Sequence, residues 1–168
     1  MTRRGWAAVV AAAGVLALVA ALAAFQPWKL WVDQSVQEAD LPAASGPAAP
    51  DRREGGPEKV FEGSAWRSYS HGETTGKVKV YRRPDGSHAV RLEDLSTSNG
   101  PDVKVVLSPK PFDGVGDLGA DHLSLGALKG NRGSSNYEIP AGTDLSRYRS
   151  AVIWCERFDA VFAASAIS

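Results

Sequence analysis

Apolar and polar residues alternate along most of the second half of the chain, as they do in β-strands that bury one face. Val78 and Val80 alternate with lysines, and the sequence Pro-Asp-Gly at residues 84–86 separates them from a second alternating run, residues 88–93. A Pro-Asp-Gly turn between two such runs is a hairpin signal. The pattern therefore predicts two antiparallel strands joined by a tight turn.

Further short runs of the same kind follow toward the C-terminus. Residues 103–107, which precede a serine-proline pair, and residues 136–139, which precede a proline, are strand candidates. Residues 150–155 form a continuous apolar run, which is typical of a strand covered on both faces. Residues 158–162 are its expected hairpin partner, and only residues 145–148 have helical spacing. Many short strands separated by Gly and Pro predict an all-β fold, an antiparallel β-sandwich or barrel-like domain.

A different pattern occupies the N-terminus, where residues 6–25 carry no charge. About twenty helical residues are enough to cross the ~30 Å hydrocarbon core of a bilayer. Two arginines precede the stretch and two tryptophans follow it, as the positive-inside rule and the aromatic anchoring of membrane helices require. We therefore expect a transmembrane signal anchor at residues 6–27, a cytoplasmic N-terminus at residues 1–5, and a single-pass cell-membrane protein whose C-terminal domain is extracytoplasmic.

A cleaved signal peptide is the alternative interpretation of this segment. Ala21-Leu22-Ala23 has the small-x-small pattern that a signal peptidase needs. The apolar stretch is longer than the roughly 7 to 15 residues usual in such peptides, which favours a retained anchor. Both interpretations place the rest of the chain outside the cytoplasm.

The segment between the predicted helix and the predicted strands has no pattern of its own. Residues 41–58 are rich in Pro, Ala and Gly and contain almost no large apolar side chain. Such a composition predicts a disordered linker that its prolines partly extend. We assign residues 28–58 to a juxtamembrane segment and linker, and residues 59–168 to one β domain of about 110 residues, which is long enough for a single core.

Charge and motifs exclude several classes of function. Nineteen basic and nineteen acidic residues give a formal net charge of zero, and no run of basic residues is longer than an arginine pair. The chain therefore lacks the electrostatic footprint of a nucleic-acid-binding protein. It also lacks Gly-x-Ser-x-Gly, His-Glu-x-x-His, P-loop and Cys-x-x-Cys-His motifs, so hydrolase, kinase and covalent-haem interpretations have no support.

Cys155 is the only cysteine, so it cannot form an internal disulfide. In an oxidising compartment an unpaired cysteine tends to be oxidised unless it is buried, ligates something or works as a thiol. Period-two counting places its side chain on the face of Ile153, opposite Trp154. The residues alone leave three roles open, namely a packed core residue, a metal or haem ligand, and a reactive thiol.

Three histidines are candidate co-ligands. His71 lies in the polar turn of residues 70–76, where it is either a solvent-accessible turn residue or a second site residue. His88 shares a strand face with two apolar residues, where a packed histidine is the usual case. His122 follows an acidic loop whose spacing does not fit an EF-hand, so a solvated loop is the expectation there.

Six short motifs follow one another along the predicted β domain. Their order and spacing cover the domain from about residue 60 to residue 167. In chain order they are Phe61-Glu62-Gly63; His71 with Gly76; Asn99-Gly100-Pro101-Asp102 before Val105-Val106-Leu107-Ser108; Leu125-Gly126-Ala127-Leu128-Lys129-Gly130; Asn136-Tyr137-Glu138-Ile139-Pro140; and Val152-Ile153-Trp154-Cys155-Glu156 with Phe158, Phe162 and Ala166. In register, the six motifs resemble the DM13 domain family, in its membrane-anchored, bacterial-type, single-domain form.

The resemblance implies an extracellular β-rich module of a redox or electron-transfer system. In it the cysteine that Cys155 matches is redox-active or ligates a cofactor, and the family position of His71 makes it the second candidate. The family settles no cofactor, so a haem and a metal ion both stay open, and a redox or cell-surface partner would be a separate protein. The residues themselves equally allow a non-enzymatic envelope-binding or structural β module in which the cysteine is buried and inert.

Overall fold

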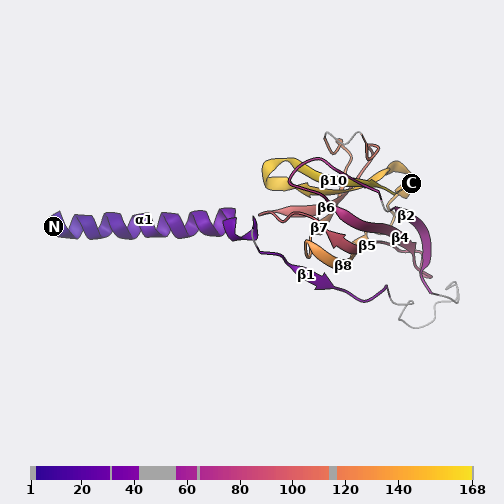
Figure 1. The fold of residues 1–168 in the computed structure, drawn as a ribbon, viewed down its shortest axis with the longest axis horizontal. Helices are drawn as coiled ribbons and strands as arrows, with labels where there is room; N and C mark the ends of the chain where they lie inside the picture. Colours follow the sequence, from indigo (N-terminus) through magenta and orange to yellow (C-terminus); the bar gives the residue numbers. More distant parts are fainter. Residues whose placement is uncertain (1–2, 31, 42–55, 64, 114–116, 168) are drawn as a thin grey trace.

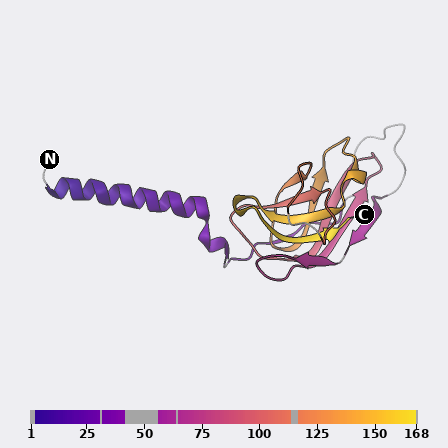
Figure 2. The same cartoon turned by 90° about the horizontal axis from the view of Figure 1, so that it is seen from above.

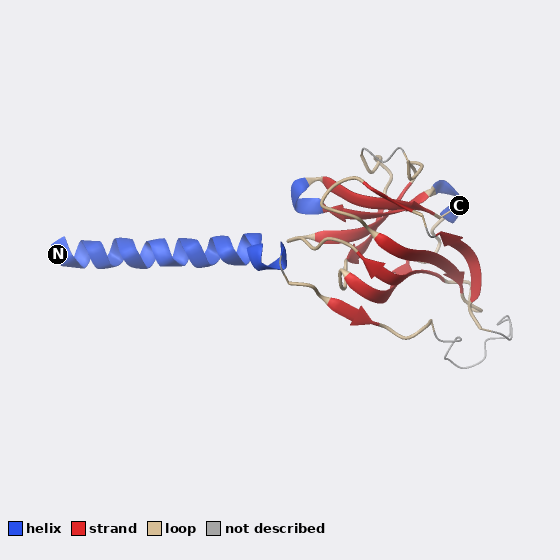
Figure 3. Ribbon diagram, in the orientation of Figure 1, coloured by secondary structure: helices blue, strands red, loops and turns tan. Residues whose placement is uncertain are grey.

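The computed structural model describes residues 3–30, 32–41, 56–63, 65–113 and 117–167. A long N-terminal helix, α1 (Arg3–Phe25), projects from one end of a two-layer arrangement of β-strands (Figure 1). Figure 3 shows that strands make up nearly all the regular structure of the domain. Two separate five-stranded sheets form the layers. The predicted all-β fold is confirmed, and it is a sandwich.

The first sheet has the strand order β1-β8-β5-β4-β2. Its neighbouring strands are antiparallel except β1 and β8, which are parallel. The strands are β1 (Ser35–Gln37), β2 (Glu58–Gly63), β4 (Thr75–Arg82), β5 (His88–Ser96) and β8 (Arg132–Ile139).

The second sheet has the order β3-β10-β9-β6-β7 and is antiparallel throughout. Figure 2 shows it from above, layered on the first sheet. Its strands are β3 (Trp66–Ser68), β6 (Val103–Ser108), β7 (Leu123–Ala127), β9 (Ser150–Cys155) and β10 (Ala160–Ala166). The described residues also form three short 3-10 helices: η1 (Pro27–Leu30), η2 (Leu145–Arg147) and η3 (Glu156–Phe158).

The predicted hairpin of β4 and β5 is confirmed. Its turn is closed by a hydrogen bond from the Arg83 amide to the Ser87 carbonyl (2.8 Å), and the Asp85 carboxylate accepts from the Ser87 amide (2.9 Å). Gly86 has φ +83°, a conformation that suits glycine. The predicted strands at residues 103–107, 136–139 and 150–155 are also present.

The core lies between the sheets. Val78, Val80, Val90 and Leu92 of the first sheet face Val105, Leu107 and Ile153 of the second, and all are buried. A second, smaller apolar cluster covers the outer face of the second sheet, where Val106 and Val152 pack with Leu118 from the loop after β6. Residues of β9 are therefore buried on both faces, which confirms the prediction made from its continuous apolar run.

Strand β1 was not expected. It lies within residues 28–58, the segment that the sequence assigns to the region before the domain, and it pairs with β8. The residues that follow β1 also cover Arg91, which is buried although the alternating pattern of β5 predicts an outward side chain. The Arg91 guanidinium donates to the Ala39 carbonyl and the Asn136 side chain (both 3.0 Å) and lies 2.9 Å from the Asp40 carboxylate. Residues 42–55 of the predicted linker lie outside the described residues.

The N-terminal helix has the features expected of a membrane span. Residues Gly5–Phe25 are long and apolar enough to cross a bilayer, and the apolar window is not buried against the rest of the molecule. Its large apolar side chains, Val15 and Leu16 among them, are exposed. In a soluble protein such a surface would be a large unpartnered apolar patch.

Candidate functional site

Cys155 is the last residue of β9 and is fully buried. Its side chain shares the main core with Ile153, whereas Trp154 packs against the outer cluster. The predicted orientation of the thiol is therefore confirmed. Among the described residues, no hydrogen bond involves the Cys155 Sγ atom.

The turn Asn99-Gly100-Pro101-Asp102 covers the thiol. Gly100 is buried, and a methyl group placed on it would lie 3.7 Å from Cys155 Sγ and 3.4 Å from the tip of the Phe162 ring. The Asp102 carbonyl accepts a hydrogen bond from the Glu156 amide (3.0 Å), which ties the turn to the end of β9. We call residues 99–102 the cover.

Asn99 holds the cover in place through both ends of its side-chain amide. Its Oδ1 accepts from the Gly100 amide (2.9 Å), and its Nδ2 donates to the carbonyl of Val32, a residue just beyond η1 (3.1 Å). The cover is therefore joined to the segment that follows the N-terminal helix. The Asp102 carboxylate lies 3.0 Å from the Lys104 ammonium, so an ion pair accounts for its side chain.

Phe162 connects the cover with His71. The register between β9 and β10 shifts at this point, because Val161 pairs with Trp154 and Ala163 with Ile153, which leaves Phe162 as an extra, bulged residue. Its carbonyl accepts a hydrogen bond from the Tyr69 amide (2.8 Å). This bond docks the following turn, and with it His71, on the bulge.

His71 is exposed but ordered. Its backbone has φ +59°, and its ring packs against the Phe162 ring with 4.9 Å between centroids and a tilt of 54°. The structure thus brings the two predicted site residues to the same end of the sandwich. His71 and Cys155 are not hydrogen bonded to each other; Phe162 is their common neighbour.

A polar cleft of about 420 Å³ opens beside the cover. It is lined by side chains from the segment after the helix (Asp33), the His71 turn, the end of β5 with residues 97–99, and Asn131 with Arg132 at the start of β8. Asn99 lines the cleft, while the neighbouring Gly100 lies over the sulfur. Cys155 itself does not line the cleft, so the cover contributes Asn99 to the cleft wall and Gly100 to the packing around the sulfur.

Hydrogen bonds hold two charged groups of the cleft, Asp33 and Arg132. The Asn131 Nδ2 and the Arg132 Nε donate to the two carboxylate oxygens of Asp33 (2.8 and 2.5 Å), and these contacts hold the pKa of Asp33 below its usual range. Glu38 is held in the same way by Lys129 and by the Asn136 amide (both 2.7 Å), which lower its pKa. The segment that follows the helix is thus fixed to β8 by ionised carboxylates.

The other two histidines lie elsewhere. His88 stands at the opposite end of β5 from the cleft, beside residues 140–143, and burial followed by the charge of Arg82 lowers its pKa. His122 is exposed, and its Nδ1 lies 2.9 Å from the Gly119 carbonyl. The His122 ring packs against Trp154 (5.9 Å between centroids), which belongs to the outer cluster, whereas the Cys155 thiol faces the main core.

The residues do not fit a resident metal centre. In the parts of the chain that the structure describes, no three His, Cys, Asp or Glu side chains converge on one point. Structural zinc needs four ligands and blue copper needs two histidines with a cysteine, whereas here one buried thiol lies near one exposed imidazole. Cys155 is fully buried and does not line the cleft, so its Sγ atom is not placed to ligate a haem bound there.

Sequence reasoning missed most of the cleft. Asp33 lies 98 and 99 positions before its hydrogen-bond partners Asn131 and Arg132 in the sequence. No local pattern marks them. The bulge at Phe162 was also unmarked, since a continuous apolar run does not show where the register shifts.

Comparison with known proteins identifies one family. A family model described as "Electron transfer DM13" matches residues 66–167, which is more than half of the chain. No curated protein and no solved structure matches this chain. The matched range begins at β3 and includes the His71 turn, the cover, Cys155 and Phe162.

Proposed function

The chain belongs to the DM13 family, and we propose that it is a membrane-anchored, extracytoplasmic electron-transfer module in which Cys155 is the redox-active residue. The observation that carries this proposal is the position of the thiol. The only cysteine lies under a short cover at the edge of a polar cleft, beside the ring on which His71 packs.

Without a resident cofactor, the reaction open to a single thiol is thiol–disulfide exchange with another protein. Deprotonated Cys155 can attack a disulfide of a separate redox partner; a mixed disulfide forms, and the partner's second sulfur leaves as a thiolate. Reactive cysteines are normally at least partly exposed. Cys155 is buried, so this role requires the cover to open while the sandwich stays folded.

The test is the reactivity of Cys155 in the folded, full-length protein. We expect an aromatic disulfide reagent to modify the thiol much faster than the domain unfolds, because only residues 99–102 must move. Unfolding is followed in parallel by circular dichroism. A visible spectrum and elemental analysis of protein purified from its native membrane check for a bound haem or metal. A colourless, metal-free protein whose thiol reacts only on unfolding contradicts the proposal.

One observation favours a second function, that of a non-enzymatic envelope module with an inert cysteine. The Sγ atom is fully buried and has no hydrogen-bond partner among the described residues, which is how a packed cysteine lies in a core. In that case Cys155→Ser has only a structural effect. It buries an unpaired hydroxyl, which costs about 1 to 3 kcal/mol of stability.

Topology gives a separate prediction. Because Gly5–Phe25 is long and apolar enough to span a bilayer and two arginines precede it, the full chain should stay in the membrane fraction. Protease added outside intact cells should digest the β domain, as a C-terminal tag lost from immunoblots would show. Recovery of soluble protein that begins near Ala24 would replace the anchor with a cleaved signal peptide.

A further inference from the structure

The tip of the β9–β10 hairpin exposes an aromatic side chain. Helix η3 forms this tip, and Phe158 at its end is 59% exposed. Asp159 turns the chain with φ +47°, and its carboxylate accepts from the Trp154 Nε1 (3.1 Å). Trp154 and Asp159 thus fix the shape of the tip, and Phe158 itself takes no part in the core clusters.

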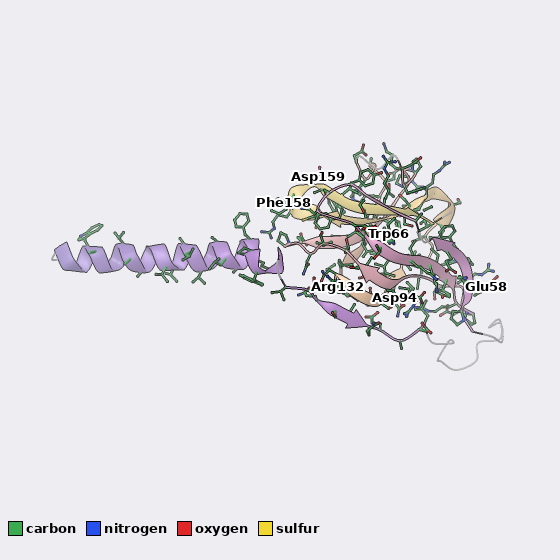
Figure 4. The ribbon with its side chains drawn as sticks, viewed as in Figure 1. Glu58, Trp66, Asp94, Arg132, Phe158 and Asp159 are labelled. Atoms are coloured by element: carbon green, nitrogen blue, oxygen red, sulfur yellow. The ribbon has the colours of Figure 1, made fainter. Side chains whose placement is uncertain are left out.

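The tip lies at the end of the N-terminal helix. The Arg157 guanidinium lies 5.8 Å from the centre of the Phe25 ring, and it donates a hydrogen bond to the Ala24 carbonyl. Figure 4 labels Phe158 and Asp159 at the end of the domain next to α1, and Glu58 at the far end. A cation here satisfies a carbonyl of the last helical turn and complements the helix dipole.

These contacts set the height of the tip relative to a bilayer. If α1 spans the membrane, its last residue, Phe25 (57% exposed), and the nearby Trp28 (46% exposed) lie at the outer interface. Aromatic side chains are enriched at this level, and arginine side chains reach from it to the headgroups. Phe158 lies at the same level because Arg157 touches the helix end.

We propose that Arg157 and Phe158 insert into the headgroup layer of the bilayer that α1 spans, so that the β domain lies on the membrane surface. The proposal rests on the membrane anchor proposed above. The lipid surface is the fitting partner because Arg157 of the tip contacts the end of the helix that enters the lipid. The acidic neighbours are already engaged, Glu156 with Lys104 (3.3 Å) and Asp159 with Trp154.

This placement has a consequence for the candidate site. Cys155 directly precedes η3, and Asp33 of the cleft follows η1 by three residues. The thiol, its cover and the cleft therefore lie at the membrane-proximal end of the domain. A redox partner of Cys155 would have to reach it at the bilayer surface.

Spin labelling of the full-length protein in vesicles of phosphatidylcholine and phosphatidylglycerol tests the proposal. A nitroxide is attached to Phe158→Cys, and collision rates are measured with oxygen, which concentrates in lipid, and with a water-soluble nickel chelate. Matched positions are Leu16→Cys in the middle of α1 and Ala141→Cys in the exposed turn after β8 at the far end. Wild-type protein labelled in parallel gives the signal from Cys155, which is subtracted from that of each variant.

We expect the ratio of oxygen to nickel collisions to be several-fold higher at positions 158 and 16 than at position 141. A water-like ratio at 158 with a lipid-like ratio at 16 overturns the proposal and leaves the anchor intact. A water-like ratio at 16 shows that the anchor itself fails, and the proposal falls with it. Because Phe158 is exposed and outside the core, the label leaves the fold unchanged.

Discussion

Gly133→Ala will detach β1 from the sheet and destabilise the domain by about 3 kcal/mol or more. Gly133 pairs with Val36 in the parallel ladder and has φ +100°. A Cβ atom on Gly133 would lie 2.0 Å from the Val36 carbonyl oxygen, a distance that no relaxed contact allows. Either β1 moves away or the backbone of β8 distorts. The measurement is denaturant unfolding of the full chain in detergent, with hydrogen exchange of residues 34–38.

Gly142→Ala is the matched control for this experiment. Gly142 also has a positive φ, +78°, but a Cβ there has open space around it. Its substitution carries only the conformational strain, about 1 kcal/mol. If Gly133→Ala costs no more than Gly142→Ala and leaves exchange at residues 34–38 unchanged, β1 is not held against β8 as described. Loss of β1 would also release Asp33 from the cleft.

The strands that the sequence predicts are those whose burial has a period of two. Val78, Val80, Val90 and Leu92 alternate because one face of β4 and β5 packs on the second sheet. The same alternation correctly predicts that the Cys155 side chain faces the core, because β9 is regular up to its last residue.

What the sequence could not predict depends on contacts between distant segments. Strand β1 has only three residues, too few for a period, and its pairing with β8 is a tertiary contact. Arg91 occupies an outward position on β5, yet the segment at residues 38–40 covers it and supplies carbonyl and carboxylate acceptors. The cover over Cys155 escapes prediction for the same reason, because Gly100 reads simply as a turn residue.

Asn99→Ala will make Cys155 accessible in the folded protein. The Asn99 side chain makes two of the hydrogen bonds that hold the cover, one to the Gly100 amide and one to the Val32 carbonyl. Each neutral bond is worth about 0.5 to 1.5 kcal/mol, so losing both should raise the open fraction of the cover roughly tenfold or more. The rate at which iodoacetamide alkylates Cys155, read by mass spectrometry below the unfolding transition, should rise by the same factor.

Asn136→Ala separates opening of the cover from general loosening. The Asn136 side chain also makes two hydrogen bonds, accepting from Arg91 and donating to the Ala39 carbonyl (both 3.0 Å), but it lies on β8 under the segment at residues 38–40. The Asn136→Ala substitution should lower the free energy of unfolding by a similar amount and leave the alkylation rate of Cys155 close to that of wild type. If both variants react only as fast as they unfold, the thiol is sealed in the core. The cover would then be a fixed part of the core packing, and the hypothesis of an inert, structural Cys155 would replace the hypothesis of a redox-active one.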